Sequence, residues 1–563
     1  MKIFIIKWRF LILLSFILIF LLSLIMRITY LQIINPNNLI HESNMRSLRI
    51  ETIPVSRGMI LDRNKHPLAV SVPVHAIWVD PKELNNRGGI IKNIYWEALS
   101  NALSISFEQL FQRINNNPNS RFVYLARQVN SEIGEYIHQL NLPGIHLKEE
   151  SRRYYPIGQA AAHIIGITNI DGQGIEGLEK SFDPWLSGIP GKRKIRKDRF
   201  GKIIEHIILK KTQKSKNLIL SIDGNLQTIV YKKLKKSVAL NKAESGTAIL
   251  VDVNTGEILA MTNVPSYNPN NLTKTNNSMM RNRAITDIFE PGSIIKPIVI
   301  VSALQKGVIT ENSIIDTRPY VLNGYRIKDV VDYESLTIEG ILKKSSNVGV
   351  SKIALSMPIE TLLETYQLFG LDKSTKLGLI GESNGFFPKN KKWTGIEKAT
   401  LSYGYGLMVT PLQLAQVYTT IGGIGFMHPL SIIKINKTNI GKQIFSPIII
   451  RQVIRMMESV ALPGGSGVQA AVHGYRIAVK TGTSKKVGSD GIYVNKYIAC
   501  AAGIAPVENP RFALVVVIND PKGGRYYGGS VSAPVFSEIM NIVLHYMNIL
   551  PDKLPENTTI VNR

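Results

Sequence analysis

The stretch from Phe289 to Pro297 reads FEPGSIIKP and places Ser293 three residues before Lys296. Pro297 lacks an N–H group and is tolerated only in the first turn of a helix, so it predicts a helix that begins close to Ser293. The spacing puts Ser293 and Lys296 on one helix face, where the helix dipole favours developing negative charge. This arrangement is typical of a serine nucleophile beside a lysine base. Alone it is a weak signal, because the pattern recurs by chance in a lysine-rich chain and an exposed first helical turn would look the same.

Two further motifs follow in order. Ser345-Ser346-Asn347 comes first, and Lys480-Thr481-Gly482-Thr483 then ends a β-rich run. The patterns S-x-x-K, S-D-N and K-T-G occur in this order in class A β-lactamases and penicillin-binding proteins. Separately, the second motif indicates a turn or cap and the third a strand end. Together they favour a serine acyltransferase, with Ser346 standing where the pattern has aspartate.

The sequence around the motifs predicts an α+β domain. Asn254-Thr255-Gly256 forms a turn between two β-rich runs, which indicates a hairpin. With three later runs this predicts one antiparallel sheet of about five strands, flanked by helices. The five expected strands lie in Thr247–Val253, Glu257–Thr262, Ile477–Thr483, Tyr497–Ile504 and Phe512–Ile518, and the expected covering helices include Pro411–Ile421 and Pro534–His545.

The N-terminus predicts a membrane anchor. Phe10 to Met26 is a run of seventeen uncharged residues, and apolar character continues to Ile34. No A-x-A-like site follows, which favours an uncleaved signal anchor over a cleaved signal peptide. Residues 1–9 are then a cytoplasmic tail held by its basic residues, 10–34 are the transmembrane anchor and juxtamembrane segment, and the rest lies outside the cytoplasmic membrane. Arg27, Arg46 and Arg49 on the far side weaken the charge argument for this orientation.

Length and composition bound the remaining organisation. A chain of 563 residues predicts two or three domains. We assign residues 46–216 to a β-rich pedestal without a catalytic constellation, 217–550 to the catalytic domain and 551–563 to a loose tail. The basic stretch Gly188–Lys202 predicts an exposed hairpin or loop. The net charge of +26 is spread along the chain, so no nucleic-acid partner is expected.

Cys500 is the single cysteine, so no intramolecular disulfide can form. It lies in the apolar run YIACAA, which predicts a buried structural thiol. No Cys/His cluster has the spacing of a zinc site, and neither a metal nor a cofactor is expected.

Further segments carry a family resemblance that runs nearly from end to end. The chain resembles the class B penicillin-binding proteins, and most of all septal peptidoglycan D,D-transpeptidases of the FtsI type. Lys65 departs from the family, which usually has glycine after Asn64, and makes that turn less comfortable. The matching segments are RGMILDRN at 57–64, RRYYP at 152–156, GIEGLE at 174–179, SYGYGLMVTPLQL at 402–414 and YYGGSVSAPVF at 526–536.

The resemblance implies a substrate and a mechanism. Ser293 would attack the penultimate carbonyl of a peptidoglycan stem peptide ending in D-Ala-D-Ala, expel D-alanine and hold an acyl-enzyme until an amine of a neighbouring peptide takes it. The N–H groups of Ser293 and Thr483 would form the oxyanion hole. β-Lactams would inhibit by acylating Ser293. The work would be done at the division septum, beside a membrane glycan polymerase of the FtsW type and other division proteins.

The same resemblance implies roles for the other motif residues. Lys296 would act as the base, and Ser345 would relay a proton between Lys296 and the leaving amine. Asn347 would orient the substrate amide and the lysine. Lys480 and the hydroxyls of Thr481 and Thr483 would bind the terminal carboxylate, while Gly482 would leave room for its approach.

Two other functions use the same motifs. A β-lactamase or D,D-carboxypeptidase differs only in using water to resolve the acyl-enzyme, and weak carboxypeptidase activity is compatible with a transpeptidase. A non-catalytic β-lactam sensor or division scaffold would keep the fold without turnover. The large N-terminal domain and the anchor argue against a small secreted β-lactamase, and the intact motifs argue against lost catalysis.

Overall fold

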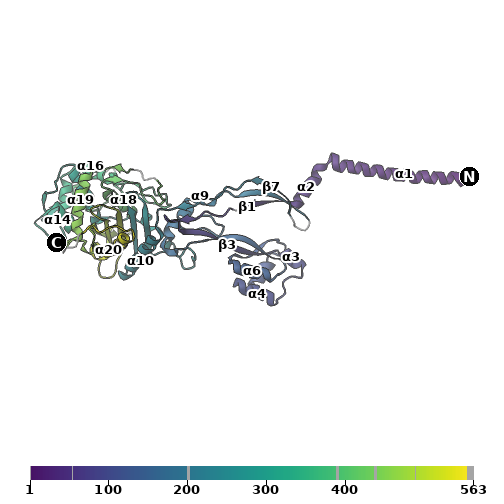
Figure 1. Ribbon diagram of the computed structural model, residues 1–563, viewed down its shortest axis with the longest axis horizontal. Helices are drawn as coiled ribbons and strands as arrows, with labels where there is room; N and C mark the ends of the chain where they lie inside the picture. The colour runs from purple at the N-terminus through teal and green to yellow at the C-terminus, as the bar shows by residue number, and fades with distance from the viewer. Residues whose placement is uncertain are drawn as a thin grey trace, which may run out of the picture. The chain divides into compact units, whose positions relative to one another are not determined.

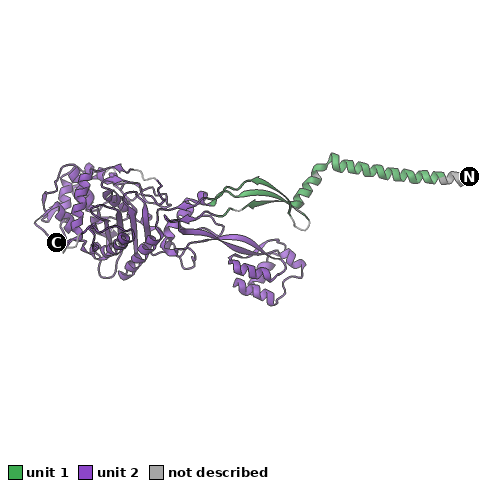
Figure 2. Cartoon of the chain, viewed as in Figure 1, with its two compact units in different colours: residues 1–56, 187–215 green, residues 57–186, 216–563 purple. Residues whose placement is uncertain are grey.

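The computed structural model describes residues 2–53, 55–198, 203–388, 392–436, 440–488 and 490–553, so most of the expected tail at 551–563 lies outside the described residues. The chain forms two compact units, which Figure 2 distinguishes by colour. The first contains residues 1–56 and 187–215, and the second contains residues 57–186 and 216–563.

The first unit combines a long apolar helix with a small sheet. Helix α1 spans Lys2–Thr29 and continues through the π-helical turn Tyr30–Ile34 to α2 at Pro36–Ser47. Residues Lys7–Ile34 are long and apolar enough to cross a membrane, and none of this span is buried in the protein. Strands β1 (Leu48–Ile53), β6 (Gly191–Lys197) and β7 (Ile203–Lys210) pair antiparallel in that order. The basic stretch predicted as a hairpin or loop contributes β6, and its residues 199–202 lie outside the described part of the chain.

The N-terminal part of the second unit is built around one long strand, β3. It pairs antiparallel with β2, β4 and β5, and β8 extends the sheet by pairing parallel with β2. Several helices that the sequence did not reveal lie beside it, and α4, α5 and α6 share a separate apolar core with β3 and β4. The strands are β2 (Ile60–Leu61), β3 (Pro67–Val79), β4 (Val123–Val129), β5 (Ile145–Tyr154) and β8 (Leu218–Ile219), and the helices are α3 (Pro81–Asn86), α4 (Ile94–Leu103), α5 (Phe107–Asn115), α6 (Ser131–Gln139), α7 (Ala162–Ile165), α8 (Gly177–Ser181) and α9 (Asp183–Ser187).

Three of the segments that carried the family resemblance meet at a buried carboxylate. Glu179 is fully buried and binds Arg57 at 2.6 Å and Arg153 at 2.7 Å. Each of the three residues comes from a different segment. Removing one partner from such a buried pair typically costs about 3–5 kcal/mol, because a charge is left without compensation. Directly after the first segment, Lys65 adopts φ 67°, a left-handed conformation that glycine takes without strain, which explains why lysine is less comfortable there.

The predicted sheet of five antiparallel strands is confirmed in the order β10-β9-β19-β18-β17, and β9 and β10 form the predicted hairpin. Cys500 on β18 lies opposite Gly482 on β17 and is 1% exposed, which confirms the buried thiol. Burial raises the pKa of this thiol. The strands are β9 (Ser245–Asp252), β10 (Ile258–Val264), β17 (Ala478–Val487), β18 (Tyr493–Ala505) and β19 (Phe512–Asn519).

Helices α10, α18 and α20 cover this sheet (Figure 1). Helix α10 (Gly224–Leu240) packs on β9 and β10, and α18 (Pro411–Gly422) packs on β9, β18 and β19, where a helix was predicted. Helix α20 spans Gly528–Tyr546, so the predicted start at Pro534 is wrong and this proline lies inside the helix. An interior proline costs about 3 kcal/mol, and the extensive burial of α20 offsets that cost.

The second unit contains further helices and short strands. They are the helices α11 (Asn277–Met280), α12 (Arg283–Thr286), α13 (Lys296–Gln305), α14 (Ile338–Lys344), α15 (Asn347–Leu355), α16 (Ile359–Leu368), α17 (Gly395–Ser402) and α19 (Pro447–Glu458), and the short strands β11 (Ile314–Asp316), β12 (Tyr320–Leu322), β13 (Tyr325–Ile327), β14 (Ser335–Thr337), β15 (Phe426–Met427) and β16 (Lys442–Gln443).

Candidate active site

Ser293 lies in a 3₁₀ turn, Gly292–Ile295, that leads directly into α13 at Lys296. Pro297 occupies the first turn of α13, as predicted. Gly292 has φ 61°, and Gly404 packs so closely against it that a Cβ on Gly404 would lie 2.2 Å from the Gly292 carbonyl oxygen. Ser293 is partly exposed and faces a cleft. Among the described residues its hydroxyl has no hydrogen-bond partner in the protein, so it is free to meet a ligand.

Lys296 is fully buried behind the serine. Its Nζ lies 2.5 Å from the Ser345 carbonyl oxygen, 2.7 Å from Asn347 Oδ1 and 3.3 Å from Ser345 Oγ. Lys296 and Ser345 are 49 residues apart in the chain. Their hydrogen bonds bring the first and second motifs into direct contact.

The second motif occupies a sharp junction between two helices. Ser345 ends α14 with φ 58° and ψ 42°, a left-handed conformation that costs a non-glycine residue about 1–2 kcal/mol. Ser346 then caps α15, because its hydroxyl accepts a hydrogen bond from Gly349 N at 2.8 Å. Asn347 is the first residue of α15. The junction therefore turns the hydroxyl of Ser345 and the amide of Asn347 toward the same lysine.

The third motif lies on β17. Lys480 is fully buried, and its Nζ donates to Ser345 Oγ and to the Thr481 carbonyl oxygen, both at 2.8 Å. The Ser345 hydroxyl thus lies between the two buried lysines, at 2.8 Å from one and 3.3 Å from the other. All three predicted motifs are brought together at this hydroxyl.

The two lysines have lowered pKa values. Burial lowers the pKa of Lys296 well below its ordinary value, the charge of Lys480 lowers it further, and Asp329 opposes the shift. Burial lowers the pKa of Lys480 to about 7. Lys296 loses hydration and also faces a cation, and both effects lower its pKa. Lys296 is therefore suited to hold a lone pair at neutral pH.

The cleft in front of these groups has a volume of about 630 Å³. Thr481, Gly482 and Thr483 line it together with Ser293, Ser345 and Asn347, whereas Lys296 and Lys480 lie behind its surface. Thr481 Oγ1 donates to Ser466 Oγ at 3.3 Å, and Thr483 Oγ1 accepts from Gly528 N at 2.9 Å. The cleft is also lined by residues that motif analysis did not select: Val330, Val331, Tyr333, Lys344, Tyr405, Gly464, Gly465, Ser466, Lys485, Tyr497, Tyr526, Tyr527 and Gly529.

Some of these additional residues had a sequence signal and others had none. Tyr405 and Tyr526 fall in segments that carried the family resemblance. In the folded chain the ring centroid of Tyr526 lies 4.1 Å from that of Tyr497, on which it stacks, and 4.5 Å from that of Tyr527. The three rings form an aromatic wall. Val330 and Val331 are 83% and 58% exposed and belong to no motif. Only the fold brings them to the cleft.

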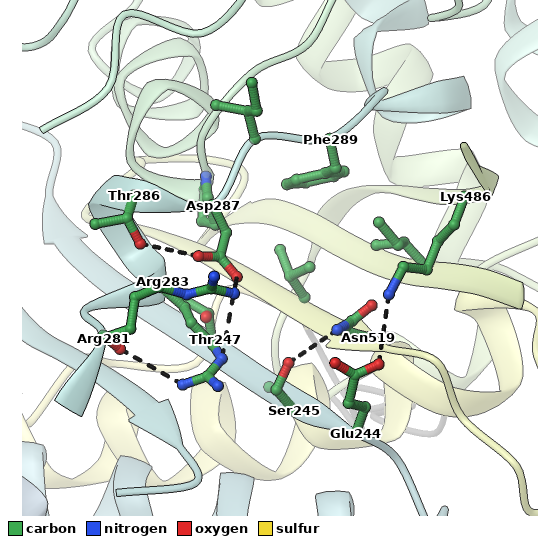
Figure 3. Close-up of a pocket in the computed structure, with 15 residues that line it drawn as sticks. Glu244, Ser245, Thr247, Arg281, Arg283, Thr286, Asp287, Phe289, Lys486 and Asn519 are labelled. Carbon is green, nitrogen blue, oxygen red and sulfur yellow. Dashed lines mark hydrogen bonds and ion pairs between the residues drawn. The ribbon is translucent and has the colours of Figure 1, made fainter. Parts of the chain in front are cut away.

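A second pocket, of about 360 Å³, lies next to β17 (Figure 3). Lys485 lines the catalytic cleft, whereas the adjacent Lys486 lines this pocket and pairs with Glu244 at 3.4 Å. Arg281 pairs with Asp287 at 2.9 Å in the same pocket. Both of its carboxylates are paired with cations and none of the motif residues lines it, so we assign the chemistry to the larger cleft. In the described residues no cluster of His, Cys, Asp or Glu could hold a metal ion.

Comparisons with known proteins identify the domains of the chain. Residues 246–541 match the model of the penicillin binding protein transpeptidase domain, and residues 52–220 match that of the penicillin-binding protein dimerisation domain. The chain is 59% identical over 561 residues to the peptidoglycan D,D-transpeptidase FtsI of Escherichia coli K12, covering 99% of this chain and 95% of that protein. It is 57% identical over 553 residues to the protein of the same name from Buchnera aphidicola of Schizaphis graminum, covering 98% and 97%.

A solved structure gives the same result for the catalytic part. The transpeptidase domain of penicillin-binding protein 3 from Burkholderia pseudomallei is 40% identical and superposes with a TM-score of 0.55. The match covers 60% of this chain and 98% of that domain.

The strained backbone of Ser345 generates a prediction for a pair of variants. Ser345→Ala and Ser345→Gly both remove the bridging hydroxyl, but only glycine relieves the left-handed conformation. We expect Ser345→Gly to be more stable than Ser345→Ala by about 1 kcal/mol, measured by thermal unfolding of the detergent-solubilised chain. Equal melting temperatures would show that the left-handed backbone conformation of Ser345 does not lower the stability of the protein.

Proposed function

The chain belongs to the FtsI family of peptidoglycan D,D-transpeptidases, and on that premise we propose that Ser293 is its nucleophile and Lys296 its general base. Members are serine-type penicillin-binding enzymes and β-lactam targets, anchored in the membrane with a periplasmic catalytic domain. Because the chain belongs to this family, we assign it as a transpeptidase and not as a hydrolase or a non-catalytic scaffold. The residue assignment rests on one observation: the Ser345 hydroxyl lies between two buried lysines, and Ser345 lines the same cleft as Ser293.

Acylation begins with a proton transfer. Neutral Lys296 takes the proton of Ser293 Oγ, and the oxygen attacks the carbonyl carbon of the penultimate D-alanine. The C–N bond to the terminal D-alanine then breaks. Because Lys480 donates to Ser345 Oγ, the Ser345 hydroxyl hydrogen is free to point toward Lys296 or the leaving amine, which suits a proton relay. An amine of a second stem peptide then attacks the acyl-enzyme and restores Ser293.

The oxyanion hole consists of the N–H groups of Ser293 and Thr483. Close backbone packing supports this assignment. A Cβ on Gly482 would lie 3.2 Å from Ile294 N, and a Cβ on Gly292 would lie 3.3 Å from the Thr483 carbonyl oxygen. The strand and the serine turn therefore face each other without intervening side chains.

The remaining motif residues bind the substrate. Thr481 and Thr483 line the cleft, and their hydroxyls contact the terminal carboxylate. Lys480 contributes its positive charge from behind the surface, since its Nζ faces Ser345. Asn347 lines the cleft and accepts a hydrogen bond from Lys296, so it orients both the lysine and the substrate amide. Gly482 keeps the approach open.

The protein acts at the division septum beside a membrane glycan polymerase of the FtsW type, with its N-terminal tail in the cytoplasm. The apolar helix at Lys7–Ile34 and the FtsI name of the relatives support this placement. We retain a pedestal at 46–216 and a catalytic domain at 217–550, supported by the family matches at 52–220 and 246–541.

Labelled penicillin tests the nucleophile. We expect one covalent adduct, which peptide mapping places on the segment containing Ser293, and no adduct in Ser293→Ala. Ser466→Ala removes another cleft serine and serves as the control, which should still be labelled at Ser293. Labelling of Ser293→Ala would refute the assignment. Release of the adduct should be slow, since rapid clearance at many turnovers per second is the behaviour of a β-lactamase.

Substitution tests the base. An ordinary lysine with a pKa of about 10.4 is only about 0.04% neutral at pH 7. The lowered pKa of Lys296 means that acylation is lost as the pH falls through that pKa and is retained above it. Arginine cannot lose its proton, so Lys296→Arg should slow acylation by penicillin by orders of magnitude at every pH. Lys485→Arg, which also lies at the cleft, should acylate at the wild-type rate. Near-normal acylation of Lys296→Arg would make Lys296 a structural cation.

Depletion of the protein in its own cells tests the septal placement. We expect filaments with incomplete septa, because cross-linking of the division wall fails while elongation continues. Microscopy of depleted cells gives the readout. Rounded cells that still divide would instead indicate a role in elongation.

A further inference from the structure

A carboxylate from outside the three motifs lies at the second motif. Asp329 belongs to the loop between β13 and β14, and it accepts hydrogen bonds from the Ser346 hydroxyl, from Asn347 N at 2.5 Å and from Val348 N at 3.0 Å. The related motif S-D-N carries its own aspartate, whereas this chain has Ser346 in that place. The fold thus supplies a carboxylate at this turn from a residue 17 positions earlier.

Asp329 completes the N-terminus of α15. The first amides of a helix have no partner within it, and a carboxylate there is further stabilised by the helix dipole. Ser346 accepts one amide hydrogen bond, from Gly349, and Asp329 accepts two more, from Asn347 and Val348. The Ser346 hydroxyl then donates to Asp329, so both caps are joined.

The groups that Asp329 holds are adjacent to those that bind Lys296. Ser345 precedes the cap in its left-handed conformation and gives Lys296 two oxygens, and Asn347 gives it a third. A turn that is strained in this way persists only where surrounding contacts fix it. The three hydrogen bonds to Asp329 are such contacts.

We propose that Asp329 is a positioning residue of the acylation reaction, which holds Ser345 and Asn347 against Lys296 and supplies the carboxylate that the second motif lacks. The proposal rests on the roles given above to Ser293 and Lys296. It also assigns a purpose to the loop itself, because the next residues, Val330 and Val331, form part of the cleft wall. Asp329 therefore ties that wall to the catalytic turn.

The charge of Asp329 has a separate consequence. The charged groups acting on Lys296 are Lys480 on β17, which lowers its pKa, and Asp329, which raises it. Loss of the Asp329 charge should lower the pKa of Lys296 further. Acylation should then persist to lower pH, so the acid limb of the plot of rate against pH shifts toward lower pH. A purely structural contact would leave the position of this profile unchanged.

The test is the rate of acylation by a fluorescent penicillin as a function of pH, using the full-length protein in detergent. Asp329→Asn keeps the shape and an acceptor oxygen for the two amides but removes the charge, so its profile should shift to lower pH with a rate within a few-fold of wild type. Asp329→Ala removes every contact as well as the charge, so its profile should shift in the same direction and its plateau rate should fall about tenfold to a hundredfold, the loss expected from a small misplacement of catalytic groups. Asp332→Ala removes an equal charge from an exposed position of the same loop and should match wild type.

The outcomes separate this proposal from the assignment of the nucleophile. An Asp329→Ala rate within twofold of wild type overturns it, and so does an equal loss in both Asp329 variants with no shift of the pH profile. The Asp329→Asn profile decides the matter even if Asp329→Ala does not fold. Labelling that survives in Ser293→Ala would instead refute the proposed function itself.

Discussion

The catalytic domain depends on one constraint. It buries two lysines completely beside a single serine hydroxyl. Lys296 and Lys480 are both inaccessible to water, and Ser345 Oγ lies within 3.3 Å of each Nζ. In the described part of the chain neither lysine forms an ion pair with a carboxylate. Two buried ammonium groups of this kind are costly, and the cost falls when one of them gives up its proton. Stability therefore favours the state that the proposed chemistry needs, a neutral amine beside the Ser345 hydroxyl.

The rest of the domain holds three separate segments at that point. The 3₁₀ turn before α13 brings Lys296, the α14–α15 junction brings Ser345, and strand β17 brings Lys480. β17 is an edge strand of the sheet. One of its sides is therefore available to the serine turn, while β18 pairs with the other side and fixes its register. The sheet thus acts as the rigid part against which both helical segments are positioned.

The elements that the sequence predicted are those encoded by local patterns. The five strands follow from β-rich runs, the nucleophile helix from Pro297, and the three motifs from their order. Other features depend on contacts between distant residues, which local patterns do not contain. Asp329 lies in an ordinary polar loop, Val330 and Val331 look like any exposed pair, and α20 begins before Pro534 because burial against the sheet outweighs the proline. The helices of the pedestal were missed because their short segments resemble the turns around them.

The close packing of main chain around the turn that contains Ser293 restricts how this protein can evolve. Gly404 lies against Gly292, Gly482 against the serine turn, and Gly528 against Gly482, each at a distance that leaves no room for a Cβ without displacement of main-chain atoms. Substitutions at these positions would disturb the reaction with the natural peptide as much as the reaction with an inhibitor. Heritable changes that discriminate between the two must therefore arise among the side chains of the cleft walls, such as Val330 and the tyrosines, where shape can change while the chemistry is kept.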